Sequence, residues 1–197
     1  MLKKIISFVE TSELPTDIAN FKVYAFTEEQ NKKDHLAIVL GNIETNKSVL
    51  SRIHSQCITG ESFFSMRCDC RYQLTESLTQ IAERGRGVVF YLQQEGRGIG
   101  LSNKIRAYNL QDKGLDTVEA NHQLGFKEDE RGYGIVSDMI NFLGIKKVDL
   151  MTNNPKKIKA LEAMGVVINQ RVPLYSSTNK YNEKYISTKV KKLGHLI

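Results

Sequence analysis

The sequence predicts an α/β fold in which a mixed sheet is flanked by helices. Short apolar segments typical of strands alternate along the chain with helical patterns of about ten residues. The composition, with 41% hydrophobic residues, 25% charged residues and three prolines, is that of ordinary globular proteins. We expect a single domain over residues 1–197, because this length suits one domain and no internal repeat is evident.

Six segments have the short apolar pattern of strands: 21–26 (FKVYAF), 36–41 (LAIVLG), 49–54 (VLSRIH), 87–92 (GVVFYL), 148–151 (VDLM) and 166–169 (VVIN). The fourth of these, GVVFYL, is continuously apolar and rich in β-formers. Such a run is typical of a strand that is buried on both faces of a sheet.

Helical periodicity or capping signals mark four further segments: from Tyr72 to about Gly85, from Ser102 to Lys113, from Ile135 to Leu143, and 156–165 (KKIKALEAMG). Asn154 and Pro155 precede the last of these and supply an N-cap and a first-turn proline. The stretch SSTNKYNEKY (176–185) is polar, so we expect a mobile C-terminal segment from about residue 175.

The charge and hydropathy of the sequence limit where the protein is found in the cell and what it can bind. No run of 18 or more apolar residues is present, and the start MLKKIISFVETSELP is too interrupted for a secretory signal. We therefore expect a cytoplasmic protein with no membrane partner. A net charge of +6 suggests an anionic partner such as nucleic acid, an acidic membrane surface or a polyphosphate. The basic residues are dispersed, as on a solvated surface, so we expect no nucleic-acid partner.

All three cysteines lie within the segment CITGESFFSMRCDC, at Cys57, Cys68 and Cys70. An odd number leaves one thiol outside any disulfide framework, so metal binding or reactivity is favoured over disulfides. Residues 68 and 70 of an extended strand would lie about 6.5–7 Å apart, so a turn must bring them to one metal. Three thiolates with an open fourth position are typical of a catalytic zinc, whereas His54 as a fourth ligand would close a structural site. Three unrelated buried thiols are the alternative.

A Gly-rich segment, QQEGRGIGL (93–101), follows the buried strand GVVFYL. Glycine allows the backbone to approach a ligand closely, and Glu95 and Arg97 add a carboxylate and a bidentate donor. A plain tight turn explains Gly96, Gly98 and Gly100 about as well.

Together these segments resemble a known family. The resemblance lies in RIHSQCITGE (52–61), SMRCDCRYQL (65–74), QQEGRGIGLSNKIRAYNLQDKGLDTVEANHQLGF (93–126), DERGYG (129–134) and TNNPKKI (152–158). They closely resemble GTP cyclohydrolase II, the enzyme that opens riboflavin biosynthesis. The resemblance covers roughly residues 20–172, with the motifs in the family's order and spacing.

The resemblance implies the GTP cyclohydrolase II fold and a hydrolase that acts on C–N bonds in cyclic amidines. The family converts GTP to 2,5-diamino-6-(5-phospho-ribosylamino)pyrimidin-4(3H)-one, formate and pyrophosphate. In the family, the cysteines matching Cys57, Cys68 and Cys70 bind one zinc ion, whose water attacks C8 of the purine. The resemblance also implies Mg²⁺ with the triphosphate, GTP as the substrate and a homodimer.

The resemblance further assigns site residues. Asp129 and Arg131 match the family's general base and nucleophile, and Tyr108 matches a tyrosine near the guanine ring. Because a guanidinium group is protonated at ordinary pH, an electrostatic clamp on the α-phosphate is the alternative role for Arg131. Matching GTP contacts are Arg52, Ile53, His54, Ser55, Gln56, Gln73, Glu95, Gly96, Arg97, Thr117, Thr152 and Lys157.

Two of these contacts have a physical rationale. The carboxylate of Glu95 is interpreted as a reader of the guanine edge, because it can accept from N1–H and the 2-amino group together. Lys157 lies in the first turn after Asn154 and Pro155, where free N–H groups and the helix dipole favour a phosphate.

Three positions depart from the family's usual residues: Gln56 stands where Glu is usual, Gln93 where Arg is common, and Gly132 where an acidic residue often follows the arginine.

Two alternatives to the main interpretation stay open. A paralogue would give a formylated product or serve another pathway. A zinc-stabilised nucleic-acid-binding module would require a fourth zinc ligand and a basic or aromatic stripe, and neither is evident.

Overall fold

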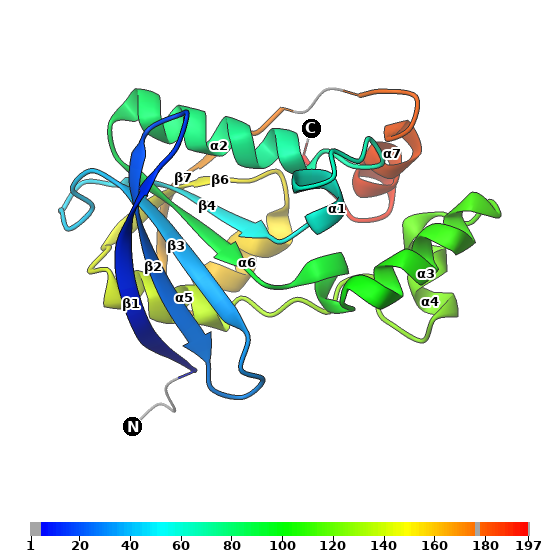
Figure 1. The fold of residues 1–197 in the computed structure, drawn as a ribbon, viewed down its shortest axis with the longest axis horizontal. Coiled ribbons are helices and arrows are strands. Elements are labelled where there is room, and N and C mark those ends of the chain that lie inside the picture. Colours follow the sequence, from blue (N-terminus) through cyan, green and yellow to red (C-terminus); the bar gives the residue numbers. More distant parts are fainter. Residues whose placement is uncertain (1–4, 176–177, 197) are drawn as a thin grey trace. The chain divides into compact units, whose positions relative to one another are not determined.

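The computed structural model describes residues 5–175 and 178–196, and Figure 1 shows the chain as a ribbon. The chain forms two compact units, each built from separate segments of the sequence. The first unit contains residues 5–54, 74–93 and 132–174. The second contains residues 55–73, 94–131 and the described residues from 175 onward. A single domain over the whole chain stays a prediction.

A mixed sheet of seven strands forms the centre of the first unit within the described residues. Its order is β1-β2-β3-β5-β4-β6-β7. The strands are β1 (Ile6–Pro15), β2 (Asn20–Glu28), β3 (Asp34–Leu40), β4 (Val49–Ser55), β5 (Gly87–Leu92), β6 (Lys147–Met151) and β7 (Val167–Val172). β1, β2, β3 and β5 pair antiparallel in that order, whereas β4, β6 and β7 are parallel. The mixed sheet and the six predicted strands are confirmed.

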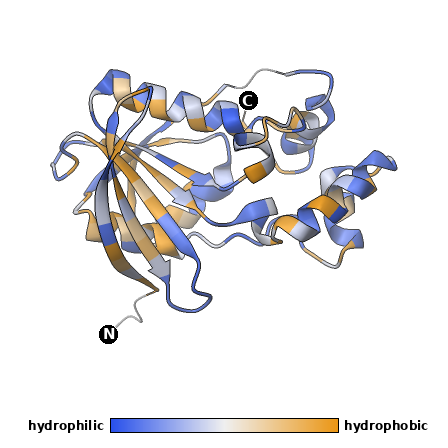
Figure 2. Cartoon of the chain, in the orientation of Figure 1, coloured by the Kyte–Doolittle hydropathy of each residue, from blue (hydrophilic) through white to orange (hydrophobic). Residues whose placement is uncertain are grey.

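Three helices cover the two faces of this sheet (Figure 1): α2 (Cys70–Arg84), α5 (Gly134–Phe142) and α6 (Pro155–Ala163). Alternate residues of β5 point to opposite faces, so Val88 and Phe90 pack in the cluster that contains α5 and α6 residues. Val89 packs on the other face, in the cluster that contains Ile81 of α2. The prediction that this strand is buried on both faces is confirmed, and Figure 2 shows hydrophobic residues along the central strands.

The second unit is helical in its described residues and contains α1 (Ile58–Glu61), the 3₁₀ turn η1 (Glu95–Gly98), α3 (Leu101–Asp112), α4 (Thr117–Gln123) and α7 (Glu183–Lys191). The predicted helix over 102–113 is α3. Helix α4 was not predicted, although Asp116 and Glu119 form a capping box that marks its start.

Two more elements differ from expectation. The edge strand β1 was not predicted, because six of its ten residues are exposed and no apolar alternation marks it. Helix α7 was not predicted and lies within the polar C-terminal segment, with the ammonium group of Lys189 2.6 Å from Asp69 Oδ1. The mobility of this segment stays a prediction. Ser176 and Ser177, which begin the polar stretch, lie outside the described residues.

Across the described part of the chain, no helix has the length and apolarity that a membrane crossing needs.

Candidate functional site

The three cysteines converge on one point in the second unit. Cys57 is the N-cap of the one-turn helix α1, and Cys70 is the first residue of α2. Their sulfur atoms and that of Cys68 all lie within 4.8 Å of one another, and Cys57 and Cys68 are 3.7 Å apart. Two sulfurs on one tetrahedral zinc lie about 3.8 Å apart, given Zn–S bonds of about 2.3 Å. The predicted turn between Cys68 and Cys70 is therefore present, and the cluster can hold a metal ion.

Gly60 shows that the local backbone fits this cluster closely. A Cβ atom added to Gly60 would lie 2.8 Å from Cys68 Sγ and 3.2 Å from Cys57 Sγ. Any larger residue would therefore displace the sulfurs. The segment keeps its short helical turn because the N–H groups of Gly60 and Glu61 both donate to the carbonyl of Cys57. The residues present thus fit a metal held by three thiolates.

His54, the possible fourth ligand, is not in this cluster within the described residues. Its ring stacks on Tyr91 in the first unit, with centroids 5.8 Å apart. The structure therefore gives no support to a closed four-ligand zinc site.

The thiols share their protons unequally. Hydrogen bonds from Cys68 and Cys70, together with the positive charge of Lys104, lower the pKa of Cys57. The hydrogen bond to Cys57 raises the pKa of Cys68 to about 11, and the same kind of contact raises the pKa of Cys70. The cluster without metal therefore favours one thiolate, at Cys57.

Lys104 of α3 is a site residue that the sequence analysis missed. Its ammonium group lies 3.1 Å from Cys57 Sγ and 2.7 Å from Glu95 Oε1, and the residue is only 8% exposed. Burial alone would lower the pKa of Lys104, but the anionic neighbours outweigh it, and the pKa is raised. The available signal was helical spacing, since Lys104 lies four residues before Tyr108 and so shares its helix face.

Glu95 is occupied by contacts inside the second unit. Its Oε1 accepts from Lys104 Nζ and from the N–H of Gly96, and its Oε2 accepts from the N–H of Ile58 at 2.7 Å. The residue is 8% exposed. The role of Glu95 as a reader of the guanine edge stays a prediction, since each carboxylate oxygen can accept more than one hydrogen bond. Ile58 follows Cys57, so Glu95 supports the metal cluster.

The Gly-rich loop forms a tight turn that is strained at Arg97. Gly96 and Arg97 both lie in the left-handed region, with φ of 63° and 60°. That conformation costs a residue with a Cβ about 1–2 kcal/mol. The Arg97 guanidinium contacts the carbonyl of Glu128 at 3.5 Å and lies 5.7 Å from the Tyr185 ring, but its buried Nη2 has no hydrogen-bond partner among the described residues. Strain and an unsatisfied buried donor together are typical of a ligand site, here one for an anion.

Asp129 and Arg131 form a buried ion pair in the second unit. Arg131 donates from Nε to Asp129 Oδ1 at 2.8 Å and from Nη2 to Oδ2 at 2.6 Å. Its Nη1 lies 3.4 Å from Ser55 Oγ, so the structure brings together three residues that the sequence singled out.

Tyr108 lies on α3 near the cysteine loop. Its hydroxyl is 3.3 Å from Thr59 Oγ1, and the guanidinium of Arg67 lies 5.0 Å from its ring centroid. Burial raises the pKa of Tyr108, so the phenol keeps its proton at neutral pH.

Five of the predicted contact residues lie in the first unit. Arg52, Ile53 and His54 end β4, and Thr152 directly follows β6, its parallel neighbour. Lys157 lies in the first turn of α6 and donates to the carbonyl of Ile53 at 2.8 Å. The predicted N-cap is confirmed, because the side chain of Asn154 accepts from the N–H of Lys156.

The remaining predicted residues, Ser55, Gln56, Gln73 and Thr117, belong to the second unit. Ser55 and Gln56 precede Cys57, and Thr117 is the first residue of α4. The side chain of Gln73 donates to Asp69 Oδ2 at 2.6 Å. Gln93, one of the departures from the family pattern, serves the first unit, since its side-chain oxygen accepts from the N–H of Asp34.

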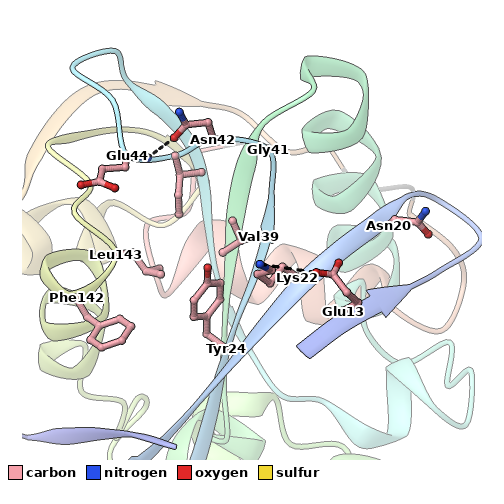
Figure 3. Close-up of a pocket in the computed structure, with 11 residues that line it drawn as sticks. Glu13, Asn20, Lys22, Tyr24, Val39, Gly41, Asn42, Glu44, Phe142 and Leu143 are labelled. Carbon is pink, nitrogen blue, oxygen red and sulfur yellow. Dashed lines mark hydrogen bonds and ion pairs between the residues drawn. The ribbon is translucent and has the colours of Figure 1, made fainter. Parts of the chain in front are cut away.

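A separate cavity of about 460 Å³ lies in the first unit, beside β1, β2, β3 and the end of α5 (Figure 3). Figure 3 shows Lys22 and Glu13 pointing toward each other at its rim, and their charges lie 3.7 Å apart. None of the predicted site residues lines this cavity, so we assign it no function.

Comparisons with known proteins agree with the geometry. The sequence matches the family model of GTP cyclohydrolase II over residues 7–173. It is 53% identical over 192 residues to GTP cyclohydrolase-2 of Azotobacter vinelandii, covering 98% of this chain and 92% of the relative. It is also 53% identical over 192 residues to GTP cyclohydrolase-2 of Tolumonas auensis, covering 98% of both chains.

One solved structure supports the fold alone. RibBX, a two-domain 3,4-dihydroxy-2-butanone 4-phosphate synthase from A. baumannii, matches with a TM-score of 0.51 and 19% identity. The match covers 90% of this chain but only 42% of that protein, so this chain spans less than half of its length.

The family match extends a little beyond the resemblance read from the motifs. It begins near the start of β1 and ends just after β7, so it includes every strand of the sheet. Together with more than half of all positions identical to named relatives, it establishes that the chain belongs to the GTP cyclohydrolase II family.

Proposed function

We propose that the protein is a zinc-dependent hydrolase that converts GTP to 2,5-diamino-6-(5-phospho-ribosylamino)pyrimidin-4(3H)-one, formate and pyrophosphate, the first step of riboflavin biosynthesis. Family membership supports the substrate. One observation carries the chemistry, namely the convergence of three cysteine sulfurs within 4.8 Å.

Cys57, Cys68 and Cys70 would hold the zinc ion. When bound, zinc with three protein ligands supplies an activated water at its fourth position near neutral pH. Tyr108 supports the same step, because its phenol is protonated and can give a proton to the imidazole nitrogen as the ring opens. Two waters are consumed: the first opens the imidazole ring and leaves C8 as a formamide, and the second hydrolyses that formamide and releases C8 as formate.

Arg97 is the best-supported phosphate ligand of the second unit. Its buried Nη2 donor has no partner among the described residues, and an anionic oxygen would satisfy it. In the first unit, Lys157 and Thr152 lie at the start of α6 and the end of β6, where backbone N–H groups and the helix dipole favour a phosphate. Mg²⁺ would accompany the triphosphate and keep much of its own water shell.

Release of pyrophosphate is assigned to Arg131 and Asp129, with two routes open. As a clamp, Arg131 neutralises the α-phosphate while a water oxygen bonds to phosphorus and the bond to pyrophosphate breaks. As a nucleophile, Arg131 must first pass a proton to Asp129, and a phosphorus–nitrogen bond then forms as pyrophosphate leaves. Water must then cleave that bond, which returns the arginine and releases the nucleotide. The observed pair supports the clamp more directly, because a carboxylate beside a guanidinium stabilises its protonated form.

Product analysis tests the proposal. The protein, loaded with zinc, is incubated with GTP labelled at C8, and the products are identified by mass spectrometry. Labelled formate, pyrophosphate and the diaminopyrimidine support the main proposal. A product that retains the labelled formyl group favours the paralogue. No turnover of GTP, with affinity for RNA that falls steeply with salt, favours the nucleic-acid-binding module.

We also propose a cytoplasmic homodimer, on family resemblance alone. Light scattering coupled to size-exclusion chromatography of the purified chain tests the dimer. A mass equal to one chain at micromolar concentration contradicts it.

A further inference from the structure

Lys104 occupies a place that the proposed reaction does not yet explain. Its ammonium group lies between the sulfur of Cys57 at 3.1 Å and the carboxylate of Glu95 at 2.7 Å. Both distances are within hydrogen-bonding range, so one buried cation donates to a thiolate and to a carboxylate at once.

Stability alone is a weak reason for this arrangement. Buried ion pairs often contribute little, because the loss of hydration offsets their attraction. Glu95 also has other donors, from the N–H groups of Ile58 and Gly96. The distinctive contact of Lys104 is therefore the one to sulfur.

We propose that Lys104 is a positioning residue of the metal centre, which offsets the negative charge of the three thiolates through its hydrogen bond to Cys57 Sγ. The inference rests on the proposed metal centre. Three thiolates around a divalent ion leave one net negative charge, which weakens the ion as a Lewis acid. An N–H donor withdraws electron density from one sulfur, and such outer hydrogen bonds tune metals in other proteins.

Glu95 holds the ammonium group of Lys104 in place beside Cys57. Its Oε1 accepts from Lys104, while its Oε2 accepts from the N–H of the residue after Cys57. The N–H of Gly96, next to Arg97, donates to the same carboxylate. The pair therefore ties the metal loop to the backbone of the Gly-rich loop.

Cobalt substitution tests the inference without any turnover. The full chain is loaded with Co²⁺, and the thiolate-to-cobalt charge-transfer band is compared among the unmodified protein, Lys104→Met, Lys104→Arg and Lys192→Met. Lys192 is a matched control, because it lies in the same unit and pairs with Asp116 and Glu119 instead of a cysteine. We expect Lys104→Met to move the band to longer wavelength, since a sulfur without a donor gives up electron density more readily.

The control variants distinguish an electronic effect of Lys104 on the metal site from a purely structural role. Lys104→Arg keeps the charge and should return the band toward its original position, whereas Lys192→Met should leave it unmoved. If Lys104→Met does not fold, Lys104→Gln keeps a neutral donor and should give a smaller shift in the same direction. A band that stays in place in every folded Lys104 variant overturns the inference.

Kinetics give a second readout that separates this inference from the proposed function. We expect kcat for GTP to fall by about 10–100-fold in Lys104→Met, with KM changing much less. If the unmodified protein does not hydrolyse GTP but the cobalt band still shifts, the proposed function fails and the role of Lys104 stands. A fall in kcat without any band shift counts against that role.

Discussion

Asp129 holds the guanidinium group of Arg131 through two parallel hydrogen bonds of 2.8 and 2.6 Å. Burial alone would raise the pKa of Asp129, but the hydrogen bonds and charge of Arg131 outweigh it, so the pKa is lowered and the carboxylate stays ionised. A forked pair of this kind fixes the plane of the guanidinium group. The Nη1 atom of Arg131 donates to Ser55 Oγ at 3.4 Å.

Replacing Arg131 tests this fixed geometry. We expect Arg131→Lys to slow pyrophosphate release by about 10²–10³-fold, because lysine keeps the charge but loses the fork. A coupled pyrophosphate assay gives the rate. Full activity in this variant contradicts both proposed roles.

The two roles of Arg131 differ in one observable. Protein quenched by acid-free denaturation during turnover is weighed by intact mass spectrometry. A mass increase of one guanylyl group that is absent in Arg131→Lys supports the nucleophile. Turnover without such an adduct under single-turnover conditions supports the clamp.

Removing one sulfur should separate the two halves of the reaction. We expect Cys68→Ser to lose zinc and formate release, because two thiolates remain where the cluster beside Gly60 has three. Pyrophosphate release should persist, since it is assigned to Arg131. Metal content, formate and pyrophosphate are measured on the same sample. Loss of both products in a correctly folded variant refutes the separation.

Arg97→Gly should weaken nucleotide binding with little effect on stability. Glycine relieves about 1–2 kcal/mol of left-handed strain but adds about 0.5–1 kcal/mol of chain entropy to the unfolded state. Loss of a charge-assisted hydrogen bond should raise the Kd of a non-hydrolysable GTP analogue by about 10–100-fold. Calorimetry and urea denaturation measure the two effects.

Arg97→Ala is the control for that prediction. It should bind the nucleotide as weakly as Arg97→Gly but unfold more easily, because alanine keeps a Cβ at φ of 60°. Equal stability of the two variants would show that the loop is not strained.

His35 should make the stability of the first unit depend on pH. The N–H of Gln93 donates to its Nδ1 at 3.1 Å, and its Nε2 lies 3.3 Å from Glu28 Oε2, so the buried ring is neutral with its proton on Nε2. Burial lowers the pKa of His35 below 6.5, in spite of the opposing effect of Glu28. Its contribution to stability is present above pH 6.5 and is lost as the pH falls through the folded-state pKa.

The measurement is the free energy of unfolding in urea between pH 5 and pH 7.5, compared with His35→Gln. We expect a steeper acid-side decline in the unmodified protein. Parallel curves would show that His35 does not cause the dependence.

Much of the fold could be predicted because local patterns decide it. The apolar run of β5 alternates between two hydrophobic clusters, as its composition predicts, and the N-cap at Asn154 starts α6 as expected. The edge strand β1 escaped prediction because it pairs through its backbone while most of its side chains stay exposed. The helix α4 was predictable from its capping box.

The cysteine cluster could also be predicted from the sequence, because all three cysteines lie within fourteen positions, which favours a shared metal ion. The contacts of Glu95 and Lys104 with the cysteine loop could not be predicted from the sequence. Cys57 and Lys104 lie 47 positions apart, and their contact exists only because α3 packs against the cysteine loop. Local sequence sets which segments become helices and strands, whereas the partner of a buried charge depends on which elements meet, and that is decided by tertiary packing.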